Sequence, residues 1–200
     1  RTGRIILPAF NSPSVWDKGD HWQAFCYYSD DDGKTWQVSE QKMDLPKRGA
    51  EEPMMVERKD GSLLCVLRTS LGAVYRADSR DGGKTWSKPV STDLKAPASP
   101  PLLKRIPSTG DLLLVWNHNY EPNHHHQGER RPLTSAISKD DGATWEHIKI
   151  VEPAPKGSAA YSAVFFHGET ALLTYYYQPT GIGGTSGVRL KHIPIAWFYK

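Results

Sequence analysis

The sequence has few cysteines and no long apolar run, and each shortage excludes a class of protein. Its 200 residues include two cysteines, Cys26 and Cys65, which lie in the apolar segments AFCYY and LLCVL. Two cysteines without a CxxC pair make no disulfide framework, so we interpret both as buried strand residues. No apolar run approaches the roughly 20 residues that a membrane-spanning helix needs, so we predict no membrane span.

The sequence also lacks a large excess of charge of either sign. Lys and Arg total 25 against 22 Asp and Glu, which leaves a formal net charge of +3. The basic residues are scattered and form no stripe of the kind that marks nucleic-acid binding, so we predict no nucleic-acid partner. Charged residues make up 24% of the chain and hydrophobic residues 38%, a composition typical of a globular domain.

A short pattern, S-x-D-x-G-x-T-W, occurs three times. It spans residues 29–36, 79–86 and 138–145, with starts 50 and 59 residues apart. Asp and Gly in the middle favour a tight turn, because Gly adopts positive φ readily and Asp, Ser and Thr side chains bond the local backbone. The closing Trp supplies an apolar anchor. Each copy therefore predicts the tip of a β-hairpin.

Short strand-like segments surround the three patterns, and no long segment has a helical period. These segments are 3–10, 23–28, 54–57, 62–68, 73–77, 112–117, 133–137, 162–167 and 171–177. One motif in about 50 residues, within a unit of about four strands, is typical of the blades of a β-propeller. We predict an all-β fold of about four blades that break near residues 48, 97 and 150.

The repeated pattern is similar to the Asp-box, or BNR repeat, of sialidases, and the chain resembles that family over nearly its whole length. Sialidase boxes lie at the periphery of the blades, so the resemblance implies no catalytic role for Asp31, Asp81 or Asp140. The implied fold is a sialidase-type β-propeller, which has six blades in the full family. We expect residues 1–200 to form a single sialidase-like domain that supplies about the last four blades and lacks N-terminal ones.

One segment resembles the active-site sequence of sialidases. Residues 51–68, EEPMMVERKDGSLLCVLR, are similar to the family's E-P-x-x-V-E-x-x-D-G-x-L-L stretch that ends in Arg. The resemblance implies that Glu52 supports a catalytic tyrosine and that Arg68 binds the carboxylate of the substrate. The neighbouring Glu51 has the weaker match.

Later segments extend the resemblance. Arg130 precedes the third Asp-box by eight residues, close to where the family places another carboxylate-binding arginine, and Arg131 is the alternative. Tyr161 begins a Tyr-Ser segment before a strand, which is the position of the family's nucleophile. Residues 188–190 and 195–197 resemble the family's last strand.

The resemblance implies a retaining exo-glycosidase that cleaves terminal sialic acid or a similar acidic sugar. Planar guanidinium groups bind a carboxylate with two hydrogen bonds, which suits Arg68 and Arg130. A neutral phenol avoids the repulsion that a carboxylate nucleophile would meet at an anionic sugar. Because a phenol is a poor nucleophile until a base removes its proton, Glu52 is the candidate base for Tyr161. The expected partner is a sialylated or other acidic glycan, and the family's habit implies a secreted or periplasmic protein.

Two parts of the family's site have no counterpart in this sequence. The family carries a further arginine in an F/Y-R-I-P stretch near the start of its catalytic domain, followed by an Asp that acts as acid/base. Arg105-Ile106-Pro107 is similar to that stretch, but it follows Glu52 and Arg68, whereas the family's stretch precedes them. We therefore expect both parts to be absent from these 200 residues, either because an N-terminal part of the protein is not included in this sequence or because the natural protein is incomplete.

Three consecutive histidines, His124, His125 and His126, lie in a polar loop. Consecutive residues seldom converge on one ion, and no Cys or acidic cluster with zinc-like spacing accompanies them, so we predict no metal site and no cofactor. This loop departs from the shorter sialidase pattern, and we interpret it as one that contacts substrate. The Gly-rich run 181–187 precedes no helix, so it predicts a hairpin tip and not a phosphate loop.

Each candidate residue also has an ordinary interpretation. A pair of glutamates is usually solvated, an arginine at the end of a strand often covers a surface, and most tyrosines pack with one polar end in water. Two other functions therefore stay open: a non-catalytic Asp-box propeller that binds glycans or proteins, and a four-bladed structural propeller. Convergence of Glu52, Arg68, Arg130 and Tyr161 in one pocket would favour the enzyme.

Overall fold

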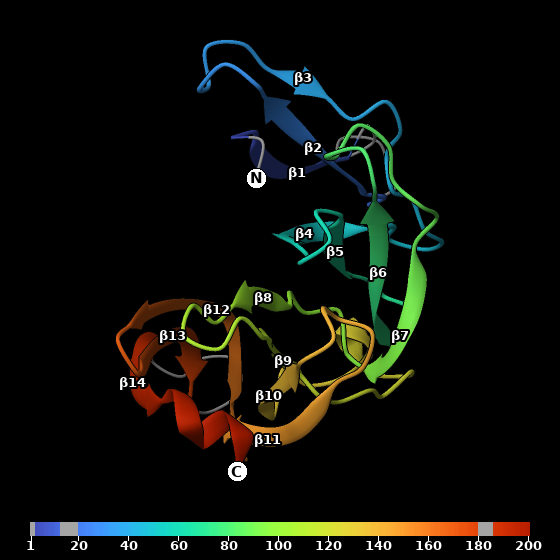
Figure 1. Ribbon diagram of the computed structural model, residues 1–200. Helices are drawn as coiled ribbons and strands as arrows, with labels where there is room; N and C mark the ends of the chain where they lie inside the picture. Colours follow the sequence, from blue (N-terminus) through green and yellow to red (C-terminus); the bar gives the residue numbers. More distant parts are fainter. Residues whose placement is uncertain (1–2, 13–19, 180–185) are drawn as a thin grey trace. The chain divides into compact units, whose positions relative to one another are not determined.

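The computed structural model describes residues 3–12, 20–179 and 186–200. These residues form fourteen strands in four sheets and two short 3-10 helices (Figure 1). The chain divides into two compact units, Arg1–Leu94 and Lys95–Lys200. Among the described residues, no helix has the length and apolar character that crossing a membrane requires.

The first unit contains two sheets, each with its strands in sequence order. The first sheet has the order β1-β2-β3, and the second has the order β4-β5-β6-β7. Their bounds are β1 (Ile5–Asn11), β2 (Gln23–Ser29), β3 (Gln37–Val38), β4 (Glu51–Glu57), β5 (Leu63–Arg68), β6 (Ala73–Ser79) and β7 (Val90–Lys95).

The second unit repeats the arrangement. Its sheets have the orders β11-β10-β9-β8 and β12-β13-β14. The bounds are β8 (Leu102–Arg105), β9 (Leu112–Asn117), η1 (His125–Gln127), β10 (Leu133–Ser138), β11 (Glu146–Glu152), β12 (Ser158–His167), β13 (Thr170–Gln178), β14 (Gly187–Pro194) and η2 (Ile195–Tyr199).

The core of each unit lies along the central strands. All six residues of β5 (LLCVLR) are buried, and so are all six of β9 (LLLVWN). A strand that is buried on both faces has a continuous apolar run in place of alternating apolar and polar residues. The first five residues of each of these two strands form such a run. Cys26 and Cys65 are fully buried and carry free thiols, which confirms their interpretation as strand residues.

All three Asp-boxes fold into the same hydrogen-bond network. In the first, Asp31 accepts bonds from the Ser29 hydroxyl at 2.8 Å, the Thr35 backbone N–H at 2.8 Å and the Thr35 hydroxyl at 2.6 Å. The Gly33 N–H also donates to the Ser29 hydroxyl at 2.9 Å, and Gly33 has a φ of 83°. The corresponding bonds recur around Asp81 and Asp140. The local chemistry of the repeat therefore explains why the same turn forms three times.

The predicted all-β fold of about four blades is confirmed, and three of the four sheets carry an Asp-box, the sheet of β12, β13 and β14 being the exception. Sheets change between residues 38 and 51, between 95 and 102, and between 152 and 158, so the predicted break near 150 falls slightly early. Residues 195–197 were expected to belong to the last strand, but they form η2. Ile195 and Phe198 are both buried there, a spacing of three that a 3-10 turn places on one side. Residues 180–185 lie outside the described part, so the predicted hairpin tip is not described.

Candidate functional site

Glu52 lies at a β-bulge near the start of β4. The register passes from Glu51 opposite Arg68 to Met54 opposite Val66, so β4 carries one more residue than β5 over this stretch. Glu52 has a φ of 45°, a left-handed conformation that is costly for a residue with a side chain. Bulges of this kind redirect a side chain and are frequent beside active sites.

The Glu52 carboxylate pairs with the first of the predicted arginines. Arg68 Nη1 donates to Glu52 Oε2 at 2.9 Å, and the Arg68 side chain is 6% exposed while that of Glu52 is 26% exposed. The structure therefore places the predicted base in direct contact with a predicted carboxylate ligand.

Glu51 is a further part of this cluster to which the sequence assigned no role. Its Oε2 lies 3.8 Å from Arg68 Nε and 3.4 Å from Arg48 Nη2, and its side chain is buried. Burial raises the pKa of Glu51, although Arg68 and Arg48 oppose that shift. Glu51 and Glu52 together hold the Arg68 guanidinium in a fixed orientation.

Tyr161 occupies the same kind of position in the second unit. The register of β12 on β13 passes from Ala160 opposite Tyr176 to Ala163 opposite Thr174, so β12 also carries an extra residue at this point. Tyr161 has a φ of 56° and is 49% exposed. The bulge therefore turns the phenol toward solvent near the start of the first strand of its sheet.

The second predicted arginine contacts this phenol. Arg130 Nη1 lies 3.4 Å from the Tyr161 hydroxyl oxygen, and Arg130 Cζ lies 5.1 Å from the centre of the Tyr161 ring. Among the described residues, no carboxylate forms an ion pair with Arg130, and its buried Nε has no hydrogen-bond partner. Arg131 instead donates to the Gly157 carbonyl at 3.4 Å.

A buried polar network positions the Arg130–Tyr161 pair. The Asn117 side chain donates to the Ala159 carbonyl at 2.8 Å, and it accepts a 2.6 Å bond from the Ser99 hydroxyl. The Ala159 N–H in turn donates to the Arg130 carbonyl at 2.8 Å. These bonds join the end of β9 and the backbone of Arg130 to the start of β12. No pattern in the sequence pointed to Asn117 or Ser99.

The four predicted residues thus form two pairs, Glu52 with Arg68 in the first unit and Arg130 with Tyr161 in the second. Among the residues that the structure describes, no group of three or more His, Cys, Asp or Glu side chains is placed to hold a metal ion. His124 instead pairs with Glu129, its Nε2 lying 3.3 Å from Glu129 Oε1.

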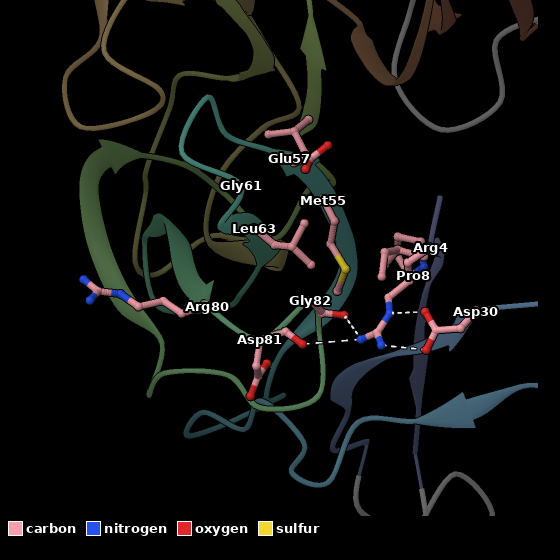
Figure 2. A pocket seen from close by; sticks show the side chains of 12 residues that line it. Arg4, Pro8, Asp30, Met55, Glu57, Gly61, Leu63, Arg80, Asp81 and Gly82 are labelled. Carbon is pink, nitrogen blue, oxygen red and sulfur yellow. Dashed lines mark hydrogen bonds and ion pairs between the residues drawn. The ribbon is translucent and has the colours of Figure 1, made fainter. Parts of the chain in front are cut away.

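A pocket of about 510 Å³ in the first unit includes none of these residues. Figure 2 shows Arg4 within it, between Asp30 and the loop of the second Asp-box. Arg4 makes two 2.7 Å bonds to Asp30 and donates to the Gly82 carbonyl at 3.0 Å. Because Arg4 joins the first box to the second through these bonds, we interpret this pocket as structural and place the candidate site at the two bulges.

Comparison with known proteins identifies relatives over most of the chain. The sequence profile of BNR repeat-like domains matches residues 1–173. A sialidase of Micromonospora viridifaciens is 31% identical over 186 residues, which cover 88% of this chain and 26% of that protein. The chain therefore spans about a quarter of the length of this curated relative.

Solved structures show the same fold. The NanB sialidase of Streptococcus pneumoniae matches with a TM-score of 0.67 at 21% identity, over 94% of this chain and 28% of that one. A Trypanosoma rangeli sialidase, in complex with 2,3-difluorosialic acid as a covalent intermediate, matches with a TM-score of 0.69 at 16% identity, over 98% of this chain and 30% of that one. At these identities the likeness shows the sialidase-type β-propeller fold.

Proposed function

Because this chain belongs to the family of BNR repeat-like domains, we propose that it is part of a sialidase-like glycosidase that releases terminal sialic acid, or a similar acidic sugar, from glycans. The observation that carries the proposal is shared by Glu52 and Tyr161. Each lies at a bulge with a left-handed φ, and strain of this kind gathers at functional sites. The acidic glycan substrate also suits a secreted or periplasmic protein.

Tyr161 is the proposed nucleophile. Its phenol oxygen attacks the anomeric carbon, the glycosidic oxygen leaves with a proton from an acid, and water later cleaves the sugar–tyrosine bond with net retention. The half-exposed phenol beside Arg130 supports this role, because the guanidinium stabilises charge that develops on the oxygen. The covalent intermediate of the Trypanosoma rangeli sialidase gives a precedent for a retaining reaction within this fold.

Glu52 is the proposed base for Tyr161, and Arg68 and Arg130 are the proposed ligands of the substrate carboxylate. Arg130 supports this assignment because it lacks a carboxylate partner among the described residues. Arg68 supports it because Glu51 and Glu52 already fix its orientation. The proposal requires both pairs to act on one substrate. It also needs an acid and a third arginine, which we assign to no residue of this chain.

A fluorogenic aryl sialoside tests this proposal in the whole protein. An aryl leaving group needs little protonation, so the assay reports mainly on the nucleophile and its base. We expect Tyr161→Phe and Glu52→Gln each to lower kcat/KM by roughly 10²–10⁴-fold. Tyr176→Phe is the matched control, since this tyrosine lies on the neighbouring strand and bonds Ser186. Full activity of Tyr161→Phe, or no release by a folded whole protein, would refute the proposal.

A glycan-binding propeller without catalysis is the second candidate. The observation that favours it is the partly buried Arg130 guanidinium, which would bind a carboxylated sugar whether or not a bond is cleaved. Titration of the whole protein with sialyllactose distinguishes the two candidates. Saturable binding that depends on Arg130, together with no product, would support the binding module.

A further inference from the structure

A second pocket of about 770 Å³ lies beside Arg130 in the second unit. The histidine loop with η1 forms one wall, and the turn that precedes β12 forms another. Its lining includes Arg130, Arg131, Lys156, His124 and Glu129, but not Tyr161. Since ligand pockets commonly measure about 300–1,000 Å³, this one is large enough for a sugar beyond the residue that is cleaved.

The charges around this pocket are unbalanced. Arg130, Arg131 and Lys156 face a single acid, Glu129. That carboxylate is already engaged, because Glu129 Oε1 lies 3.3 Å from His124 Nε2 and 3.6 Å from Arg131 Nη2. Lys156 is exposed, and no acidic side chain in the described part of the chain pairs with it. The pocket therefore carries a positive potential that favours an anion.

Backbone contacts hold both walls of the pocket in place. The His126 carbonyl accepts a 2.7 Å bond from the Ala98 N–H, and the Gln127 carbonyl accepts a 2.8 Å bond from the Glu121 N–H. On the other wall, Gly157 lies so close to the chain that an added Cβ would be 1.8 Å from the Gln178 carbonyl oxygen. A site preformed in this way loses little conformational entropy when it binds a ligand.

We propose that this pocket recognises an anionic substituent, a sulfate or a carboxylate, on the part of the glycan that adjoins the cleaved sugar. The inference rests on the proposed function, because Arg130 joins the two sites. Its guanidinium reaches the Tyr161 hydroxyl on one side and lines the pocket on the other. Lys156 and Arg131 supply the further positive charge, and the histidine loop gives the pocket its wall.

The test compares 3′-sialyl-N-acetyllactosamine with its 6-sulfated form in the whole protein. We expect the wild type to cleave the sulfated glycan with about tenfold higher kcat/KM than the unsulfated one, and Lys156→Ala to reduce that ratio to near one. Lys104→Ala is the control, because Lys104 is an exposed lysine on β8 outside the pocket. Equal rates on both glycans in the wild type, or a ratio that Lys156→Ala leaves unchanged, would overturn the proposal.

Calorimetric binding separates failure of this proposal from failure of the proposed function. If neither glycan is cleaved, the proposal still predicts that the whole protein binds the sulfated glycan about tenfold more tightly than the unsulfated one, and that Lys156→Ala removes the difference. Equal affinities would refute the pocket assignment alone. Higher salt should reduce the preference, because screening weakens a partly exposed charge pair.

Discussion

A buried carboxylate in the second unit provides the sharpest prediction on stability. Glu152 ends β11 and is 6% exposed. Its Oε2 accepts a 2.7 Å bond from the Tyr175 hydroxyl and a 3.0 Å bond from Arg189 Nη1, and Lys191 Nζ lies 3.3 Å away. The carboxylate thus links β11 to β13 and β14. Burial alone would raise the pKa of Glu152, but the bonds from Tyr175 and the two cations lower it.

Two substitutions separate the parts of this interaction. Breaking a buried ion pair by removing one partner costs about 3–5 kcal/mol. Because Arg189 and Lys191 are 47% and 35% exposed, water solvates them when Glu152 is lost, so we expect about 2–3 kcal/mol for Glu152→Ala. Glu152→Gln keeps an oxygen to accept the Tyr175 bond and loses the charge, so it should cost about half as much.

Urea unfolding of both variants, followed by circular dichroism, measures these costs as shifts in the free energy of unfolding. The wild type and Lys139→Ala serve as references, since Lys139 pairs with Glu146 at the exposed surface and its loss should leave the free energy of unfolding close to that of the wild type. If Glu152→Ala unfolds within about 0.5 kcal/mol of the wild type, the network does not join these sheets and the reasoning from burial is wrong.

Two further predictions concern the stability of the protein at low pH and the space around Gly157. In the Asp-boxes, bonds from Thr35 lower the pKa of Asp31 to about 2, and bonds from Thr144 and Ser138 outweigh burial and lower that of Asp140 to about 2. Because the pKa of each carboxyl is lower in the folded state, the stabilising effect is present above the unfolded pKa of 3.8 and is lost as pH falls toward 2. The urea midpoint of the wild type should therefore drop over this window, and that of the Asp31→Asn/Asp140→Asn double variant should drop less. Equal drops in the two proteins would contradict the assignment. Gly157→Ala would push a Cβ into a backbone carbonyl and should lower Tm by several degrees, whereas Gly187→Ala, with nothing within 4 Å, should change Tm little; matching Tm values would contradict the close approach.

The repeat predicted the fold well because its information is local. Each Asp-box contains the side chains that close its own turn, so the sequence specifies three equivalent loops and a spacing for the blades. Apolar strands such as β5 and β9 were also recognisable. The strands β3, β7, β8 and β11 were missed. Two of them are very short (QV and LLKR), and the other two are largely exposed and polar (VSTDLK and EHIKIVE), so their sequences resemble loops.

The sequence was sufficient to predict the candidate site residues, but not the β-bulges on which Glu52 and Tyr161 lie. Resemblance to a family pointed to Glu52, Arg68, Arg130 and Tyr161, and the structure pairs them within each unit. The bulges come from register shifts between the paired strands β4 and β5 and between β12 and β13, which composition does not reveal. One signal was present: Pro53 lies within β4, and proline inside a sheet is confined largely to edges and bulges.

The most direct measurement of the central claim is covalent trapping on Tyr161. The whole protein is incubated with 2,3-difluorosialic acid, the compound held as a covalent intermediate in the matched Trypanosoma rangeli sialidase, and peptides are mapped by mass spectrometry. Our account predicts one sugar adduct on the peptide that contains Tyr161, absent in Tyr161→Phe and weaker in Glu52→Gln. An adduct on another residue, or none in a folded whole protein, would contradict it.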